Sequence, residues 1–175
     1  MRGLRYLSLA ALLAFSACDT SMPTDMSYPV VLDRGVEIPY MVSEGHFVNN
    51  PFEAITYPTC LVIREYECFE AVFSIAWVQG LDESKLITEE GMEKGFVLSI
   101  IYKGYDSVSL GIEKVVLHNG ELIVLFTKEL RMSGTSFTGN YHLTLLIDDC
   151  DFDSVALFEN GRRKEHVQAI DVYCH

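Results

Sequence analysis

The chain has 175 residues, of which 49% are hydrophobic, and carries a formal net charge of −12 at pH 7. This length predicts one domain, and the apolar content exceeds that of disordered chains and suffices for a sizeable core. The acidity disfavours nucleic acid or an anionic membrane surface as a partner, and its simplest role is to keep the protein soluble.

The N-terminus has the parts of a secretory signal. Arg2 and Arg5 precede an apolar run over residues 6–15, and small residues follow it. The twelve residues from Tyr6 to Ala17 are too few to span a bilayer core, which takes about 20. We therefore expect residues 1–17 to be a signal peptide rather than a buried helix. Its removal takes two of the 13 basic residues and none of the 25 acidic ones, which leaves a net charge of −14.

The end of this run, Phe15-Ser16-Ala17-Cys18, resembles the lipobox of bacterial lipoproteins. The resemblance implies cleavage before Cys18, then diacylation of its sulfur and acylation of its amine with chains such as palmitate. Each buried methylene contributes about 0.8 kcal/mol, so two or three chains anchor a protein durably. Residues 18–29 are short and proline-punctuated and are expected to form a tether. The protein would then lie on a cell membrane, facing the periplasm or the cell surface.

Residues 30–175 are expected to fold as a single globular domain. Strands are predicted at 30–32 and 60–63, and the segment 43–58 between them reads as loop with short extended pieces. The principal helix is predicted over 65–79, with Gly80 as its stop, since its apolar side chains form one stripe that packs on the sheet. That stripe comprises Tyr66, Phe69, Val72, Phe73, Ala76 and Trp77. Residues 81–95 predict a loop that holds a turn of helix.

Residues 112–126 predict the central hairpin of the domain. Asn119-Gly120 suits the two positive φ angles of a type I′ turn, and aliphatic residues flank it on both sides. A two-residue loop places Val116 opposite Ile123 and Val115 opposite Val124, with His118–Glu121 and Leu117–Leu122 nearer the turn. Both faces of this ribbon are apolar, so we expect both to be covered.

Further strands are predicted at 96–102 and 141–147. Asn160-Gly161 repeats the hairpin signal and would pair residues 154–159 with about 163–170. The complete pattern is α+β, with a mainly antiparallel sheet or open barrel packed by one principal helix.

Four stretches, 95–100, 119–126, 141–147 and 155–161, resemble the C-terminal domain of the protease-complex-subunit (PrcB-like) lipoproteins, which are accessory partners of a bacterial surface protease. The similarity lies in strand order and hydrophobic spacing. It implies that the protein binds or stabilises another envelope protein.

Few residues carry a pattern typical of chemistry. Asp149, Asp151 and Asp153 have the spacing of the first ligands of a calcium loop, but Ser154 and Asn160 stand where an EF-hand needs glycine and an acid. A solvated acidic turn is the favoured interpretation. The five histidines lack metal-binding spacing, and His142 and His166 alternate into strands as structural residues would. No nucleophile elbow or phosphate loop is present, so we expect no cofactor, while a triad of distant residues stays open.

Export would place the cysteines in an oxidising compartment. Besides Cys18 there are four, which allow three pairings. A hairpin at Asn160-Gly161 puts Cys150 opposite Asp171, three positions from Cys174, and this favours a Cys150–Cys174 bridge. Cys60–Cys68 then remains as the second bridge.

Arg162, Arg163 and Lys164 lie on the last predicted strand, where charges protect a sheet edge from indiscriminate pairing. The same residues could steer an acidic segment of a partner onto that edge. We favour a binding or accessory lipoprotein for another envelope protein, such as a surface protease, without enzymatic activity. The alternatives are an envelope hydrolase with a triad not visible in sequence and a structural envelope component.

Overall fold

The computed structural model describes residues 34–49, 58–76, 79–104, 107–131 and 139–174. The expected signal peptide (1–17), Cys18, the tether (18–29) and the strand expected at 30–32 lie outside the described residues. Within the described ranges, no helix combines the length and apolarity needed to cross a membrane.

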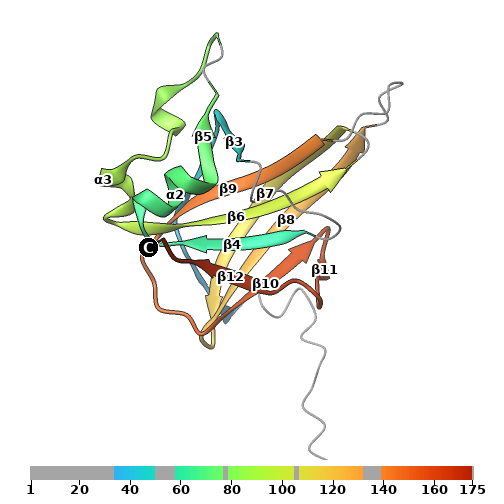
Figure 1. The fold of residues 1–175 in the computed structure, drawn as a ribbon. Helices are drawn as coiled ribbons and strands as arrows, with labels where there is room; N and C mark the ends of the chain where they lie inside the picture. The colour runs from blue at the N-terminus through green and yellow to red at the C-terminus, as the bar shows by residue number, and fades with distance from the viewer. Residues whose placement is uncertain (1–33, 50–57, 77–78, 105–106, 132–138, 175) are drawn as a thin grey trace, which may run out of the picture.

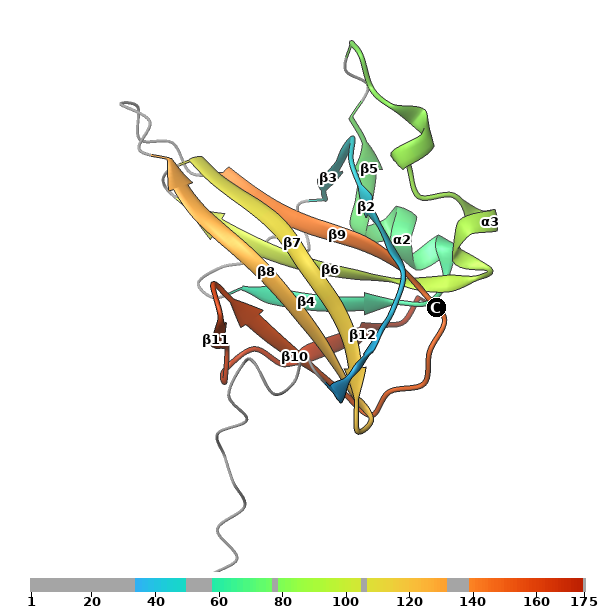
Figure 2. The same cartoon turned by 180° about the vertical axis from the view of Figure 1, so that it is seen from behind.

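Ten strands form two five-stranded sheets (Figures 1 and 2). In sheet A the order is β1 (Val36–Glu37), β7 (Ser107–His118), β8 (Glu121–Arg131), β10 (Ser154–Glu159) and β11 (Arg162–Arg163). In sheet B it is β12 (Ala169–Val172), β4 (Thr59–Ile63), β6 (Gly95–Gly104), β9 (Gly139–Asp148) and β2 (Tyr40–Ser43).

Smaller elements cover the outer face of sheet B. They are the two-stranded ribbon of β3 (His46–Val48) and β5 (Phe73–Ile75), the helices α2 (Tyr66–Val72) and α3 (Glu89–Met92), and the 3₁₀ turn η2 (Glu83–Lys85). Figure 1 shows α2, β3 and β5 on the same side of this sheet. The loop with a helical turn predicted for residues 81–95 is confirmed.

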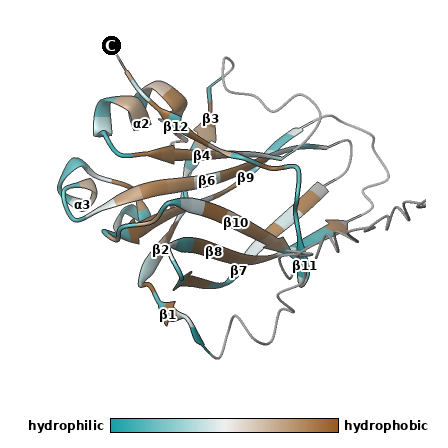
Figure 3. Ribbon diagram, turned by 90° about the horizontal axis from the view of Figure 1, so that it is seen from below, coloured by the Kyte–Doolittle hydropathy of each residue, from teal (hydrophilic) through white to brown (hydrophobic). Residues whose placement is uncertain are grey.

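Alternate residues of β6 divide the interior into two cores. Phe96, Leu98 and Ile100 point toward sheet A, while Val97 and Ile101 point toward the helices, and each of them is at most 1% exposed. Apolar residues predominate along the strands that meet between the sheets (Figure 3). Sheet B is therefore buried on both faces, and side chains on its outer face lie beneath α2 and the β3–β5 ribbon.

The α+β class predicted from the sequence is confirmed. Two strand pairs are parallel, β10 with β8 and β12 with β4, so the sheets are mixed and do not close into a barrel. The predicted position of the central hairpin is also confirmed, since β7 and β8 lie inside sheet A.

The predicted register of that hairpin is confirmed. Asn119 and Gly120 have φ angles of 51° and 78°, and the four predicted pairs from His118–Glu121 to Val115–Val124 are present. A bulge between Ile112 and Lys114 shifts the register farther from the turn. Val116 and Ile123, on the face opposite Val115 and Val124, are at most 1% exposed, so both faces are buried as expected.

The predicted helix over 65–79 is too long. The helix ends at Val72, because Phe73 is extended (φ −123°, ψ 145°) and begins β5, which pairs with β3. Phe73 and Ile75 have the aromatic and β-branched side chains that favour strands. The pairing with β3 therefore overrides the helical spacing of the stripe, and Gly80 does not end a helix.

The second hairpin, at Asn160-Gly161, is confirmed only at its turn. Two pairs form, Phe158–Arg163 and Glu159–Arg162, and the chain then leaves sheet A. Its last strand, β12, joins sheet B parallel to β4, so the predicted strand over 163–170 is wrong. On its other edge, β10 pairs in parallel with β8 along its whole length.

Both predicted disulfides are wrong. The bridge joins Cys68 to Cys174, with Cα atoms 5.3 Å apart, and Cys60 and Cys150 are free thiols. Cys60 belongs to the core between the sheets, whereas Cys68 belongs to the core under the helices, so they lie on opposite faces of sheet B. Cys150 likewise packs against the first core and Cys174 against the second.

Candidate functional site: a pocket beneath helix α2

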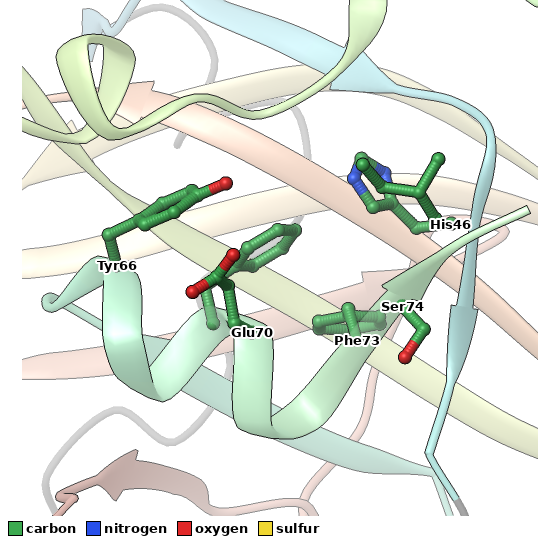
Figure 4. A pocket seen from close by; sticks show the side chains of 7 residues that line it. His46, Tyr66, Glu70, Phe73 and Ser74 are labelled. Atoms are coloured by element: carbon green, nitrogen blue, oxygen red, sulfur yellow. The ribbon is translucent and has the colours of Figure 1, made fainter.

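A pocket of about 260 Å³ lies between α2 and the β3–β5 ribbon, on the outer face of sheet B (Figure 4). Helix α2 and strand β5 are consecutive in the chain, so one segment supplies most of the lining. β3 closes the far side. The lining residues are His46, Tyr66, Phe69, Glu70, Phe73, Ser74 and Ile75.

His46 is the most buried polar residue of the pocket, with 7% of its surface exposed. Its Nδ1 lies 2.9 Å from Ser43 Oγ, and Ser43 donates its single hydroxyl hydrogen to the Lys85 carbonyl oxygen at 3.1 Å. Ser43 therefore accepts from His46, whose Nδ1 carries the proton. The other ring nitrogen, Nε2, is left with a lone pair and has no hydrogen-bond partner in the described structure.

A chain of hydrogen bonds runs beneath His46. His142 Nε2 lies 2.9 Å from the His46 carbonyl oxygen, to which it donates, and its Nδ1 lies 2.9 Å from Thr144 Oγ1. Thr144 in turn lies 2.9 Å from Ser99 Oγ, and both hydroxyl residues are at most 1% exposed. These contacts fix the neutral tautomer of His142 and attach β3 to sheet B.

Both imidazoles are held neutral. Burial lowers the pKa of His46 below its ordinary value, the nearby His142 lowers it further, and a hydrogen bond to the Glu44 backbone opposes them. Burial also lowers the pKa of His142, against a hydrogen bond to the His46 backbone. At neutral pH, His46 Nε2 is therefore a hydrogen-bond acceptor.

The pocket walls are aromatic. The ring centroids of Phe69 and Phe73 are 5.2 Å apart, and the His46 ring stands edge-on to Phe69 with centroids 5.1 Å apart. Tyr66 stacks with Phe69 at 6.0 Å. On the other side of the core, Phe73 lies 5.5 Å from the His142 ring.

Polar groups surround the pocket opening on the helix side. Figure 4 shows the Tyr66 hydroxyl and the Glu70 carboxylate on α2, with the His46 ring across from them. Burial raises the pKa of Tyr66 above its ordinary value, and the negative charge of Glu70 adds to this. Ser74 donates to Asn49 Oδ1 at 2.8 Å, and its hydroxyl points away from the His46 ring (Figure 4).

This arrangement suits binding better than nucleophilic catalysis. In the described ranges neither His46 nor His142 hydrogen bonds to a carboxylate, and Ser43 is buried with its hydroxyl hydrogen committed to a backbone carbonyl. A serine nucleophile needs an imidazole that accepts its proton and an acid that orients the imidazole. The pocket instead presents an orphaned acceptor, aromatic faces and a carboxylate.

The residues singled out from the sequence lie elsewhere. No three His, Cys, Asp or Glu side chains of the described segments form a group that could hold a metal ion, and this includes Asp149, Asp151 and Asp153. The Asp153 backbone amide donates to the Gly120 carbonyl at 2.7 Å, so this residue supports the central turn. Arg162 and Arg163 form β11 at the edge of sheet A, and Lys164 follows them.

Sequence reasoning did not find the pocket. His46 falls in a segment expected to be loop, and 96 residues separate it from His142. The expectation that His142 is a structural residue agrees with its hydrogen bonds. The aromatic stripe of the helix, interpreted as core, supplies the walls through Tyr66, Phe69 and Phe73.

Comparisons of this chain with protein-family models, with curated proteins and with solved structures find no match. The resemblances to bacterial lipoproteins and to the PrcB-like domain stay predictions from the sequence.

Proposed function

We propose that the protein is a lipid-anchored envelope lipoprotein that binds another envelope protein, through the edge formed by β11. The supporting observation is that β11 pairs with β10 on one side and ends sheet A on the other. The outer side of such a strand offers backbone donors and acceptors to an extended segment of a partner.

The surroundings of β11 favour an acidic segment. A hollow of about 340 Å³ adjoins the strand, lined by Pro58, Arg163, Lys164, Glu165, His166 and Val167. Two of these lining residues are basic, in a chain whose net charge is −12. On β12, which follows β11 in the chain and is the edge strand of sheet B, Ile170 is 53% exposed and offers an apolar contact. The partner segment would therefore be extended, with an acidic and an apolar side chain.

The three basic residues have different surroundings. Arg163 is bonded to Glu121 at 2.6 Å and Lys164 to Glu159 at 3.0 Å, so both charges are balanced within the chain. Arg162 is exposed and forms no ion pair within the described residues. Arg162 is thus the residue whose charge is available to a partner.

Photo-crosslinking in cells that export the protein tests this proposal, with the crosslinking group placed at Lys164. We expect Arg162→Glu to reduce the yield of a discrete crosslinked species several-fold, while the thermal unfolding midpoint stays unchanged. Lys94→Glu is the matched control, since Lys94 is exposed and lies near α3, far from β11. Equal yields in both variants would place the binding surface elsewhere, and turnover of an ester or peptide by the purified protein would contradict the non-enzymatic function.

A further inference from the structure

The pocket beneath α2 has a composition that selects the charge of its ligand. His46 Nε2 and the Glu70 carboxylate both offer lone pairs. Among the described residues no lysine or arginine lines the pocket, and the others are Tyr66, whose hydroxyl bonds to Glu70, and the apolar Phe69, Phe73 and Ile75. The pocket is therefore rich in acceptors and poor in donors.

Nε2 of His46 is buried without a hydrogen-bond partner in the described structure, and this requires an explanation. A buried acceptor without a partner costs free energy, and such groups are rare in folded proteins unless a ligand, an ion or water satisfies them. The bond from Ser43 to the Lys85 carbonyl leaves the Ser43 oxygen as an acceptor and so favours the tautomer with the proton on Nδ1 of His46. The group that satisfies Nε2 must therefore bring its own hydrogen.

Aromatic faces and a carboxylate favour a cation over a neutral donor. The stacked rings of Tyr66, Phe69 and Phe73 offer π faces. Glu70 supplies the counter-charge at the opening, and in the neighbouring hollow four acids, Glu65, Glu67, Glu89 and Glu93, outnumber the single basic residue, Arg64. An anion would meet repulsion there.

We propose that this pocket binds a primary alkylammonium group, carried by a lysine side chain of a polypeptide or by a free amine. The ammonium donates to Nε2 of His46, and the Glu70 carboxylate balances its charge at the opening. Its alkyl chain lies against the aromatic walls. His46 Nε2 is nearly closed to solvent, so Tyr66 or Ile75, which are only partly buried, moves aside when the ligand enters.

This inference does not rest on the function proposed for β11. The pocket lies on the outer face of sheet B, whereas β11 is the edge of sheet A, and Figure 1 shows them on different sides of the molecule. Failure of either proposal leaves the other standing.

The test is a titration of the full-length protein, in an uncharged detergent, followed by NMR. The probes are n-butylammonium, n-butanol, an end-blocked tripeptide with a central lysine, and the same peptide with that lysine acetylated. We expect each ammonium probe to bind at least about tenfold more tightly than its neutral counterpart. The Nε2 resonance of His46 should shift on binding, and that of His142 should not.

Variants of α2 assign the effect to the pocket. Glu70→Gln should weaken binding of the ammonium probes about tenfold. Glu67→Gln removes the same charge from the same helix outside the pocket, and should weaken binding much less. A lysine peptide that binds much more tightly than butylammonium identifies a polypeptide ligand, and equal affinities identify a free amine. Equal binding of charged and neutral probes, equal losses in the two variants, or binding without a shift at His46 would each overturn the proposal.

Discussion

Cys68 is bonded to Cys174 across 106 residues of sequence, so the C-terminus is fastened to the helix that lines the pocket. The geometry follows from β12, which runs parallel to β4 and brings Val172 beside Ile63. The chain enters α2 three residues after Ile63, and the two cysteines meet there. By loop entropy alone such a bridge stabilises the fold by about 4.7 kcal/mol.

Non-reducing peptide mapping should therefore join the peptides that contain Cys68 and Cys174. Cys68→Ser should lower the free energy of unfolding by about 2–5 kcal/mol in urea, and reducing agent should lower that of the wild type by a similar amount. Cys150→Ser serves as the control and should change little, because Cys150 is unpaired and only partly buried. A peptide joining Cys68 or Cys174 to any other cysteine would contradict this pairing.

Cys60 should resist alkylation in the folded protein. It has no exposed surface, and burial raises its pKa to about 12, so the reactive thiolate is scarce at neutral pH. Iodoacetamide should label Cys150 first, and Cys60 only after urea unfolds the chain. Mass spectrometry of the labelled peptides measures both rates, and fast labelling of Cys60 without urea would show that β4 opens.

Local signals in the sequence predicted the elements whose structure is decided locally. Asn119-Gly120 set both the turn and the register of β7 with β8, since a two-residue loop leaves the strands no freedom. The same signal at Asn160-Gly161 predicted its turn. This dipeptide could not predict how far the pairing continues. After Arg163 the chain leaves β10, whose other edge pairs with β8, and its last strand pairs with β4 in sheet B.

The pocket depends on contacts that no short stretch of sequence encodes. His46 and His142 meet because β3 lies across β9, and Phe73 turns from helix to strand because β3 is available for pairing. Parallel pairing of β12 likewise decides which cysteines meet. The sequence shows which residues are apolar. The face that each residue occupies and the strand that it pairs with depend on the tertiary fold.

Acidification should destabilise the protein through His46 and His142. The pKa of each is lowered in the fold, first by burial, so below about pH 6.5 the unfolded chain binds more protons than the folded one. Stability from these groups is fully present above that pH and decreases as pH falls toward the lowered values. NMR titration of both imidazoles should give midpoints below those of the same residues in urea, and midpoints at or above the urea values would contradict the neutral network.

Gly95→Ala should destabilise the start of β6. A β-carbon at Gly95 would overlap the backbone carbonyl of Ile147 in the paired strand β9, which cannot swing away. We expect a loss of about 1–3 kcal/mol in the free energy of unfolding. Gly91→Ala is the control, because its β-carbon would meet side-chain atoms, the end of Leu146 and the Thr88 hydroxyl, and no backbone, and alanine favours the helix by about 1 kcal/mol. Equal losses in the two variants would mean that β6 and β9 adjust freely.

Attachment to the membrane should depend on Cys18 alone. With the signal removed, the protein carries a net charge of −14, which an anionic bilayer surface repels, so acyl chains must supply the attraction. Cys18→Ala should leave the uncut precursor or release the protein into the soluble fraction, whereas Cys150→Ala should remain in the membrane fraction. Mass spectrometry of the wild type should find an N-terminal peptide that begins at Cys18 and carries two or three acyl chains. An unmodified mature N-terminus at any other residue would refute both the lipobox and the anchored function.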